Sequence, residues 1–126
     1  MMSNIRPVKT AIIGCGAISE AYLSTMINRF KILDVVGCHD RNPEKAQAAA
    51  QKHGIQALTL DEILADEAIE IVVNLTTPVA HHAVIKQLLE AGKHVYTEKV
   101  LAVELEHAAE LVELADQKGL YLGAAP

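Results

Sequence analysis

A glycine-rich segment lies directly between the first strand-like run of this chain and its first helical segment. The strand candidate, Val8 to Ile13, leads into Gly14-Cys15-Gly16-Ala17-Ile18-Ser19. Helical periodicity follows, with apolar residues at every fourth position: Ile18, Tyr22, Met26 and Phe30. Strand, glycine turn and helix in this order match the dinucleotide-binding fingerprint G-x-G-x-x-G/A, with Ser19 in the last position.

Each small residue of this segment has a physical role in such a fingerprint. Gly14 permits the tight turn, Gly16 lets a pyrophosphate approach the backbone, and Ser19 is small enough for close packing of helix on strand. The helix then directs its free N–H groups and its positive dipole end at the phosphates. We therefore predict that the cofactor contacts this turn at Gly14, Gly16, Ala17 and Ile18. The bare pattern also occurs as a glycine-rich turn in other α/β proteins.

Strand-like and helical segments alternate along the rest of the chain. The predicted later strands are Ile32–Cys38, Gln56–Leu58, Ile69–Leu75, His94–Thr97 and Leu120–Leu122. The predicted later helices are Pro43–His53 with Asn42 as cap, Asp61–Ala65, Val79–Ala91 and Val103–Lys118. We expect the last helix to bury one face: Leu101, Leu105, Ala108, Ala109, Val112 and Ala115. This order predicts one α/β domain over residues 1–126, a doubly wound, mostly parallel six-stranded Rossmann sheet with strand order 3-2-1-4-5-6 and helices on both faces.

Composition excludes several other classes of protein. A net charge of −5 leaves no basic footprint for nucleic acid, and no apolar run approaches the ~18 residues that cross a bilayer. The segment Met1 to Pro7 does not have the pattern of a secretion signal. Cys15 and Cys38 form no disulfide framework, so we interpret them as buried, reduced thiols of a cytoplasmic protein, with a regulatory disulfide as the alternative.

The acidic residue expected after the second strand is Asp40. It lies about 20 residues beyond the fingerprint, where a carboxylate binds the adenosine ribose and repels a 2′-phosphate. The alternative is an ordinary turn aspartate. The adjacent Arg41 fits either stacking on the adenine or pairing with a 2′-phosphate, so the cofactor is NAD or NADP, with NAD favoured.

Two further segments lie where strands end, at the edge where ligands of open α/β sheets bind. Thr76, Thr77 and Pro78 follow the fourth strand, as ligand contacts or as a helix cap. In the next helix, His81 faces the cofactor or lies on the surface. His81 and His82 are adjacent and point in different directions, so we predict no metal site.

The fifth strand ends in a charged pair. Lys99 would point its ammonium at the nicotinamide end of the cleft and orient a substrate oxygen, and Glu98 would contact the nicotinamide ribose. The alternative is a charged pair in an ordinary loop.

Together these segments resemble the N-terminal domain of the glucose–fructose oxidoreductase and inositol dehydrogenase (Gfo/Idh/MocA) family. The matching stretches are residues 11–19, 39–42, 76–82 and 98–102, and the closing Gly123-Ala124-Ala125-Pro126 is similar to the crossing into the family's second domain. The resemblance implies NAD(P)-dependent hydride transfer on sugars, cyclitols or related polyols. It assigns substrate binding and catalysis to Lys99 and the adenosine ribose to Asp40.

The chain departs from the family pattern in two places. Val100 replaces the proline of the usual Glu-Lys-Pro, and we expect a trans Lys99–Val100 bond because a non-proline cis bond costs ~3–4 kcal/mol. The resemblance implies a second domain with most of the substrate pocket and the catalytic Asp and His, and we expect this chain to lack it. We therefore expect cofactor binding without turnover, and a homodimer through apolar surface near the last strand. The alternatives are a standalone nucleotide-binding module, an inactive truncated remnant and an S-adenosylmethionine-dependent methyltransferase.

Overall fold

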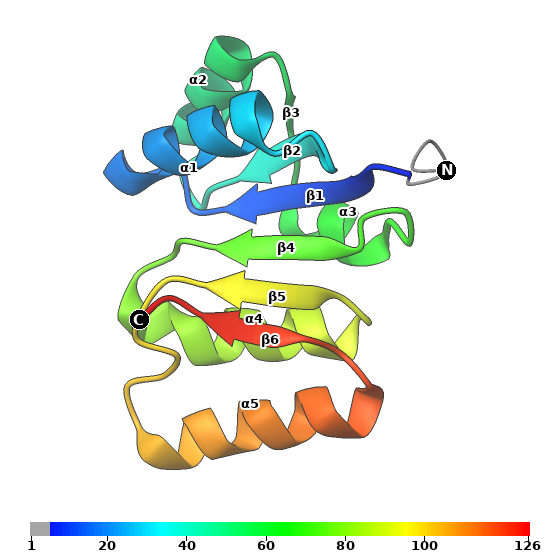
Figure 1. Cartoon of the computed structure of the whole chain (residues 1–126). Coiled ribbons are helices and arrows are strands. Elements are labelled where there is room, and N and C mark those ends of the chain that lie inside the picture. The colour runs from blue at the N-terminus through cyan, green and yellow to red at the C-terminus, as the bar shows by residue number, and fades with distance from the viewer. Residues whose placement is uncertain (1–5) are drawn as a thin grey trace.

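The computed structural model describes residues 6–126, and within that range six strands form one parallel sheet in the order β3-β2-β1-β4-β5-β6 (Figure 1). Met1 to Ile5, part of the predicted domain and of the N-terminal segment interpreted above, lie outside the described residues. The strands are β1 (Val8–Ile13), β2 (Leu33–His39), β3 (Gln56–Ala57), β4 (Ile71–Asn74), β5 (His94–Thr97) and β6 (Leu122–Ala124). The predicted α/β class and strand order are confirmed.

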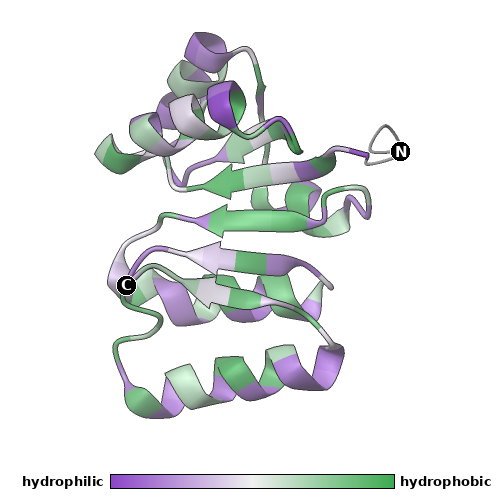
Figure 2. Cartoon of the chain, in the orientation of Figure 1, coloured by the Kyte–Doolittle hydropathy of each residue, from purple (hydrophilic) through white to green (hydrophobic). Residues whose placement is uncertain are grey.

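Helices cover both faces of the sheet. They are α1 (Ala17–Arg29), α2 (Pro43–His53), α3 (Leu60–Ala65), α4 (His81–Glu90) and α5 (Leu105–Lys118), with a 3₁₀ turn, η2 (Pro78–Ala80), before α4. Side chains of β1 alternate between the faces, so Ile12 packs with Leu23 of α1, whereas Ala11 packs with Leu88 of α4. The hydrophobic residues concentrate in strands such as β4 (Figure 2), as expected of a sheet covered on both sides.

Local sequence explains where α2 begins and ends. The Asn42 side chain accepts a hydrogen bond of 3.0 Å from the Glu44 N–H, and Pro43 opens the helix. Gly54 ends it in the left-handed conformation, with φ of +70°. These signals were the predicted ones, and both helix ends are confirmed.

The apolar face predicted for the first helix and the buried face predicted for the last helix are only partly buried in the structure. In α1, Ser19, Leu23 and Met26 are buried, whereas Ile18 and Phe30 are about half exposed. In α5, the buried face passes through Leu111 and Ala115, and the predicted members Leu105 and Val112 are exposed. Both helices have apolar residues on more than one side, so periodicity alone did not select the side that meets the sheet.

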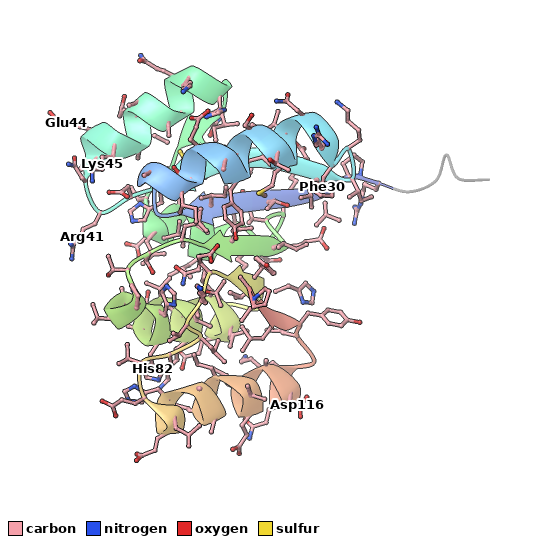
Figure 3. All side chains as sticks on the ribbon, turned by 60° about the vertical axis from the view of Figure 1, so that its left-hand side comes forward. Phe30, Arg41, Glu44, Lys45, His82 and Asp116 are labelled. Carbon is pink, nitrogen blue, oxygen red and sulfur yellow. The ribbon has the colours of Figure 1, made fainter. Side chains whose placement is uncertain are left out.

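Helices α4 and α5 are joined at their surface by an ion-pair cluster centred on Glu110. Its carboxylate lies 2.9 Å from the Lys86 ammonium and 2.8 Å from His82 Nε2, and the His82 ring stacks on His107 with centroids 3.9 Å apart. Hydrogen bonds from Lys86 and then His82 lower the pKa of Glu110. Figure 3 shows His82 on the side of α4 that faces α5.

We predict that Glu110→Gln lowers the melting temperature at pH 7 and not in acid. A carboxyl group whose pKa is lowered in the folded protein stabilises that protein at pH values above the group's ordinary pKa of 4.5. This contribution is lost as the pH falls through the folded pKa. Thermal melts of both proteins from pH 7 to pH 3 measure the difference. Glu113→Gln, on the same helix, is the control and should show no such pH dependence. A difference that persists unchanged at pH 3 would contradict the ion-pair explanation.

Candidate functional site

The backbone turn after β1 admits only glycine at position 14. Gly14 has φ of +102°, and a Cβ there would lie 2.6 Å from both the carbonyl carbon and the carbonyl oxygen of Leu75. The Gly14 N–H donates a hydrogen bond of 2.7 Å to the His39 carbonyl, so the turn is held between β2 and the end of β4. The close approach of these backbones is what directs the chain into α1.

Gly16, by contrast, has an ordinary backbone conformation and open space around it. Its φ is −80°, and a Cβ built there would meet no atom within 4 Å. It is the N-cap of α1, and no side chain caps the helix at this position. The N–H groups of the first turn, beginning at Ala17 and Ile18, therefore face an open approach. That combination suits an anion such as a diphosphate.

Ser19 fills the third small position of the fingerprint as predicted. It is 4 % exposed, and its hydroxyl donates a hydrogen bond of 2.6 Å to the Gly16 carbonyl. The side chain therefore packs beneath the turn and fixes its geometry from the protein side. The approach from solvent stays open.

Asp40 is aimed at the glycine turn. Its Oδ1 accepts a hydrogen bond of 2.8 Å from the Cys15 N–H, and its Oδ2 accepts one of 2.8 Å from the Asn42 N–H. Each carboxylate oxygen keeps further acceptor capacity for hydroxyl groups of a ligand. Arg41, the next residue, extends into solvent from the β2–α2 loop (Figure 3), beside this carboxylate in sequence.

The two cysteines are free thiols within the described residues. Cys38 is buried, as predicted, but Cys15 is only partly buried because it belongs to the turn. Interaction with the Cys38 thiol, followed by burial, raises the pKa of Cys15, whereas the same contact lowers the pKa of Cys38.

A buried amide organises the ends of β4 and β5. Asn74 donates from Nδ2 to the Thr97 hydroxyl at 3.0 Å, and its Oδ1 accepts from the Thr76 hydroxyl at 2.8 Å. Thr77 is exposed and is the N-cap residue of η2, as the helix-cap alternative predicts, but its side chain makes no cap hydrogen bond. Thr76, Thr77 and Pro78 lie at the carboxyl end of β4, next to the turn after β1, because those two strands are neighbours.

His81 is fully buried, so the alternative that it is a surface histidine is wrong. Nδ1 contacts the Val100 carbonyl and Nε2 lies 2.9 Å from the Thr76 carbonyl. Both ring nitrogens therefore face main-chain atoms of the protein, and contact of His81 with the cofactor stays a prediction.

Glu98 and Lys99 lie at the carboxyl end of β5, as predicted. Lys99 is exposed, and Glu98 accepts a hydrogen bond from the Tyr22 hydroxyl of α1. Burial, and then the hydrogen bond to Glu98, raises the pKa of Tyr22. The Lys99–Val100 peptide bond is cis, which corrects the expected trans bond. Val100 is the second residue of that bond, and its carbonyl is the one that His81 contacts.

Tyr22 and Asn74 are site residues to which sequence analysis assigned no role. Tyr22 was expected only as part of a helix face, yet it joins α1 to the end of β5 across 76 positions of sequence. Tyr22 and Tyr96 also line a mainly apolar groove of about 540 Å³ on the α1 side of the sheet, together with Met26 and Phe30. No local pattern indicates such contacts, although a buried polar residue at a strand end, like Asn74, is itself a signal.

Comparison with known proteins agrees with this geometry. The family model GFO_IDH_MocA, described as an oxidoreductase family with an NAD-binding Rossmann fold, matches residues 8–125. An uncharacterized oxidoreductase of Schizosaccharomyces pombe is 37% identical over 92% of this chain and 33% of its own length. An inositol 2-dehydrogenase of Salmonella typhimurium is 30% identical over 89% of this chain and 34% of its own length.

Solved structures share the fold. The WlbA dehydrogenase from Chromobacterium violaceum, in complex with NADH and UDP-GlcNAcA, superposes with a TM-score of 0.90 and 27% identity, over 97% of this chain and 36% of that one. This chain thus spans about a third of the length of the relatives that it matches.

Within residues 6–126, none of the helices has the length and apolar character of a membrane span. In the same range, no group of three or more acidic, histidine or cysteine side chains is arranged to hold a metal ion.

Proposed function

The chain belongs to the GFO_IDH_MocA oxidoreductase family, with its NAD-binding Rossmann fold, and we propose that residues 1–126 form one domain that binds the dinucleotide at the glycine turn. The observation that carries this proposal is the open backbone at Gly16, at a helix N-terminus that no side chain caps. The N–H groups of Ala17 and Ile18 would receive the diphosphate, with Gly14 setting the turn. Asp40 would bind the adenosine ribose, and Arg41 would lie near the adenine.

The remaining predicted site residues would hold the other half of the cofactor. Thr76, Thr77 and Pro78 lie at the neighbouring strand end, and Glu98 would exchange its Tyr22 partner for hydroxyls of the nicotinamide ribose. Lys99 would orient and polarise the oxygen of a bound substrate through its ammonium group. The nicotinamide supplies hydride transfer when bound, and the protein supplies position and charge.

We propose polyols, sugars or sugar derivatives as the substrates of the oxidoreductase to which this domain corresponds. Relatives that support this class include the inositol 2-dehydrogenase and the structure bound to UDP-GlcNAcA. We propose that this chain binds cofactor without turnover, because the side chains that it places at the nicotinamide end are those of Lys99 and Glu98. Of these, Glu98 is already hydrogen-bonded by Tyr22.

Calorimetric titration with NAD and NADP, paired with turnover assays on a panel of polyols, tests this function. Micromolar binding, tighter for NAD, with no reduction of the cofactor is the expected result. No heat with either cofactor would sink the proposal and support an inactive remnant. Turnover of a polyol would overturn the part of the proposal that limits the chain to binding.

Asp40→Ala is predicted to weaken NAD binding by about 30-fold, equivalent to about 2 kcal/mol. The substitution removes the proposed ribose contacts and also the hydrogen bond to the Cys15 N–H. Because the carboxylate repels a 2′-phosphate, the NAD-to-NADP affinity ratio should fall as well. Asp34→Ala, near the start of the strand that Asp40 follows, is the matched control and should bind NAD like the wild type. An unchanged affinity ratio in Asp40→Ala would argue against a ribose contact.

We propose a homodimer that forms through the β6 side of the sheet. β6 is an edge strand of the described sheet, and Tyr121 beside it is 81% exposed. Unpaired strand edges and exposed apolar side chains both favour pairing with another chain. Light scattering over a concentration series should show a dimer, and Tyr121→Lys should shift it toward monomer. A monodisperse monomer at high concentration would contradict this proposal.

The free thiols at Cys15 and Cys38 support a reducing, cytoplasmic location.

A further inference from the structure

His81 connects the two loops that carry the proposed nicotinamide-side residues. The Thr76 carbonyl, 2.9 Å from Nε2, belongs to the loop after β4, and the Val100 carbonyl, in contact with Nδ1, belongs to the loop after β5. The ring is fully buried between them. Thr77 follows one contact point directly, and Lys99 precedes the other directly. The histidine is therefore the one side chain among the described residues that hydrogen-bonds both loops.

Each ring nitrogen of His81 is directed at a main-chain carbonyl oxygen, a group that only accepts hydrogen bonds. Within the described residues, the ring has no carboxylate partner, and its hydrogen-bond partners are these two carbonyls.

We propose that His81 is a positioning residue: a buried side chain that clamps the β4 and β5 loops and so holds Lys99 and Thr77 in register. This role deepens the proposed function, on which its importance for catalysis rests, because the clamp acts on main-chain atoms beside the proposed contacts. His81 sets the spacing of the two loops between which the nicotinamide half would lie.

The adjacent His82 offers a matched control. It lies on the same helix, one position on, but its Nε2 pairs with Glu110 of α5, away from the two loops. His81→Gln keeps a polar side chain of similar reach but removes the ring whose two nitrogens face the two carbonyls. His82→Gln removes an imidazole from the same helix without touching either loop.

The experiment is hydrogen exchange of backbone amides in the wild-type chain and in both variants at neutral pH. Amide exchange in the loops at 76–77 and 98–102 should be at least tenfold faster in His81→Gln than in the wild type, with β1 and β4 unchanged, and unaltered in His82→Gln. Loops that exchange equally in both variants would overturn the proposal. The readout uses no dinucleotide, so failure to bind NAD is a separate result.

Discussion

Alanine at position 16 is expected to weaken NAD binding about 100-fold, a change of about 2.7 kcal/mol, without loss of the fold. A Cβ at Gly16 meets no protein atom within 4 Å, and the φ of −80° suits any residue, so the free protein accommodates the methyl group. The same methyl group would occupy the space through which the diphosphate approaches the N–H groups of Ala17 and Ile18. Charge-assisted hydrogen bonds of this kind contribute about 1.5–3 kcal/mol each, so lengthening them accounts for the loss.

Two measurements on this variant separate binding from folding. Calorimetry with NAD gives the affinity, and thermal melting without NAD gives the stability, which should match the wild type. Gly54→Asn is the matched control, because it replaces another glycine with open space around it, at a left-handed helix end that asparagine tolerates. Wild-type affinity in Gly16→Ala would place the diphosphate elsewhere.

Gly14→Ala should have the opposite effect and destabilise the fold itself, by about 3 kcal/mol or more. The positive φ of +102° is unfavourable for a residue with a Cβ, and the added carbon would lie 2.6 Å from the backbone of Leu75. That neighbour is main chain at the end of β4, so relief requires moving a strand rather than rotating a side chain. The junction of β1 with β4 is the centre of the sheet.

Urea denaturation of the wild type and of Gly14→Ala measures this difference. We expect a lower midpoint with an unchanged slope, or a chain that does not fold. A loss of less than about 1 kcal/mol would show that the turn relaxes around alanine. The two glycines thus have different roles although they are two positions apart. Gly14 permits the path of the backbone, and Gly16 leaves access for the diphosphate.

Much of this fold could be predicted because strand-turn-helix order is a local property. Asn42, Pro43 and Gly54 mark the ends of α2 through hydrogen bonds and backbone angles within a few residues. Parallel strands joined by helices then allow few arrangements, so the strand order followed from the alternation. The buried side of α5 did not follow, because Leu105 and Val112 are as apolar as Leu111, and the choice among them depends on packing between distant segments.

The candidate site likewise contains some residues that a local motif predicts and others that only the folded structure brings together. Gly14, Gly16 and Asp40 were predictable because a short motif fixes their geometry relative to one strand and one helix. The contact of Tyr22 with Glu98 and the burial of His81 between two loops were not, because they join segments that only the folded sheet brings together. His81 was expected at the cofactor because a polar side chain early in α4 lies near the right edge, and its rotation into the protein interior depends on the two carbonyls.

Our main proposal is that backbone N–H groups at the start of α1 bind the diphosphate of NAD. An amide NMR titration of the wild-type chain with NAD tests it most directly. We expect the largest shifts at Gly16, Ala17 and Ile18, saturating together with the amides flanking Asp40. Shifts that are absent at saturating NAD, or that are confined to α5 and the far ends of the strands, would contradict it.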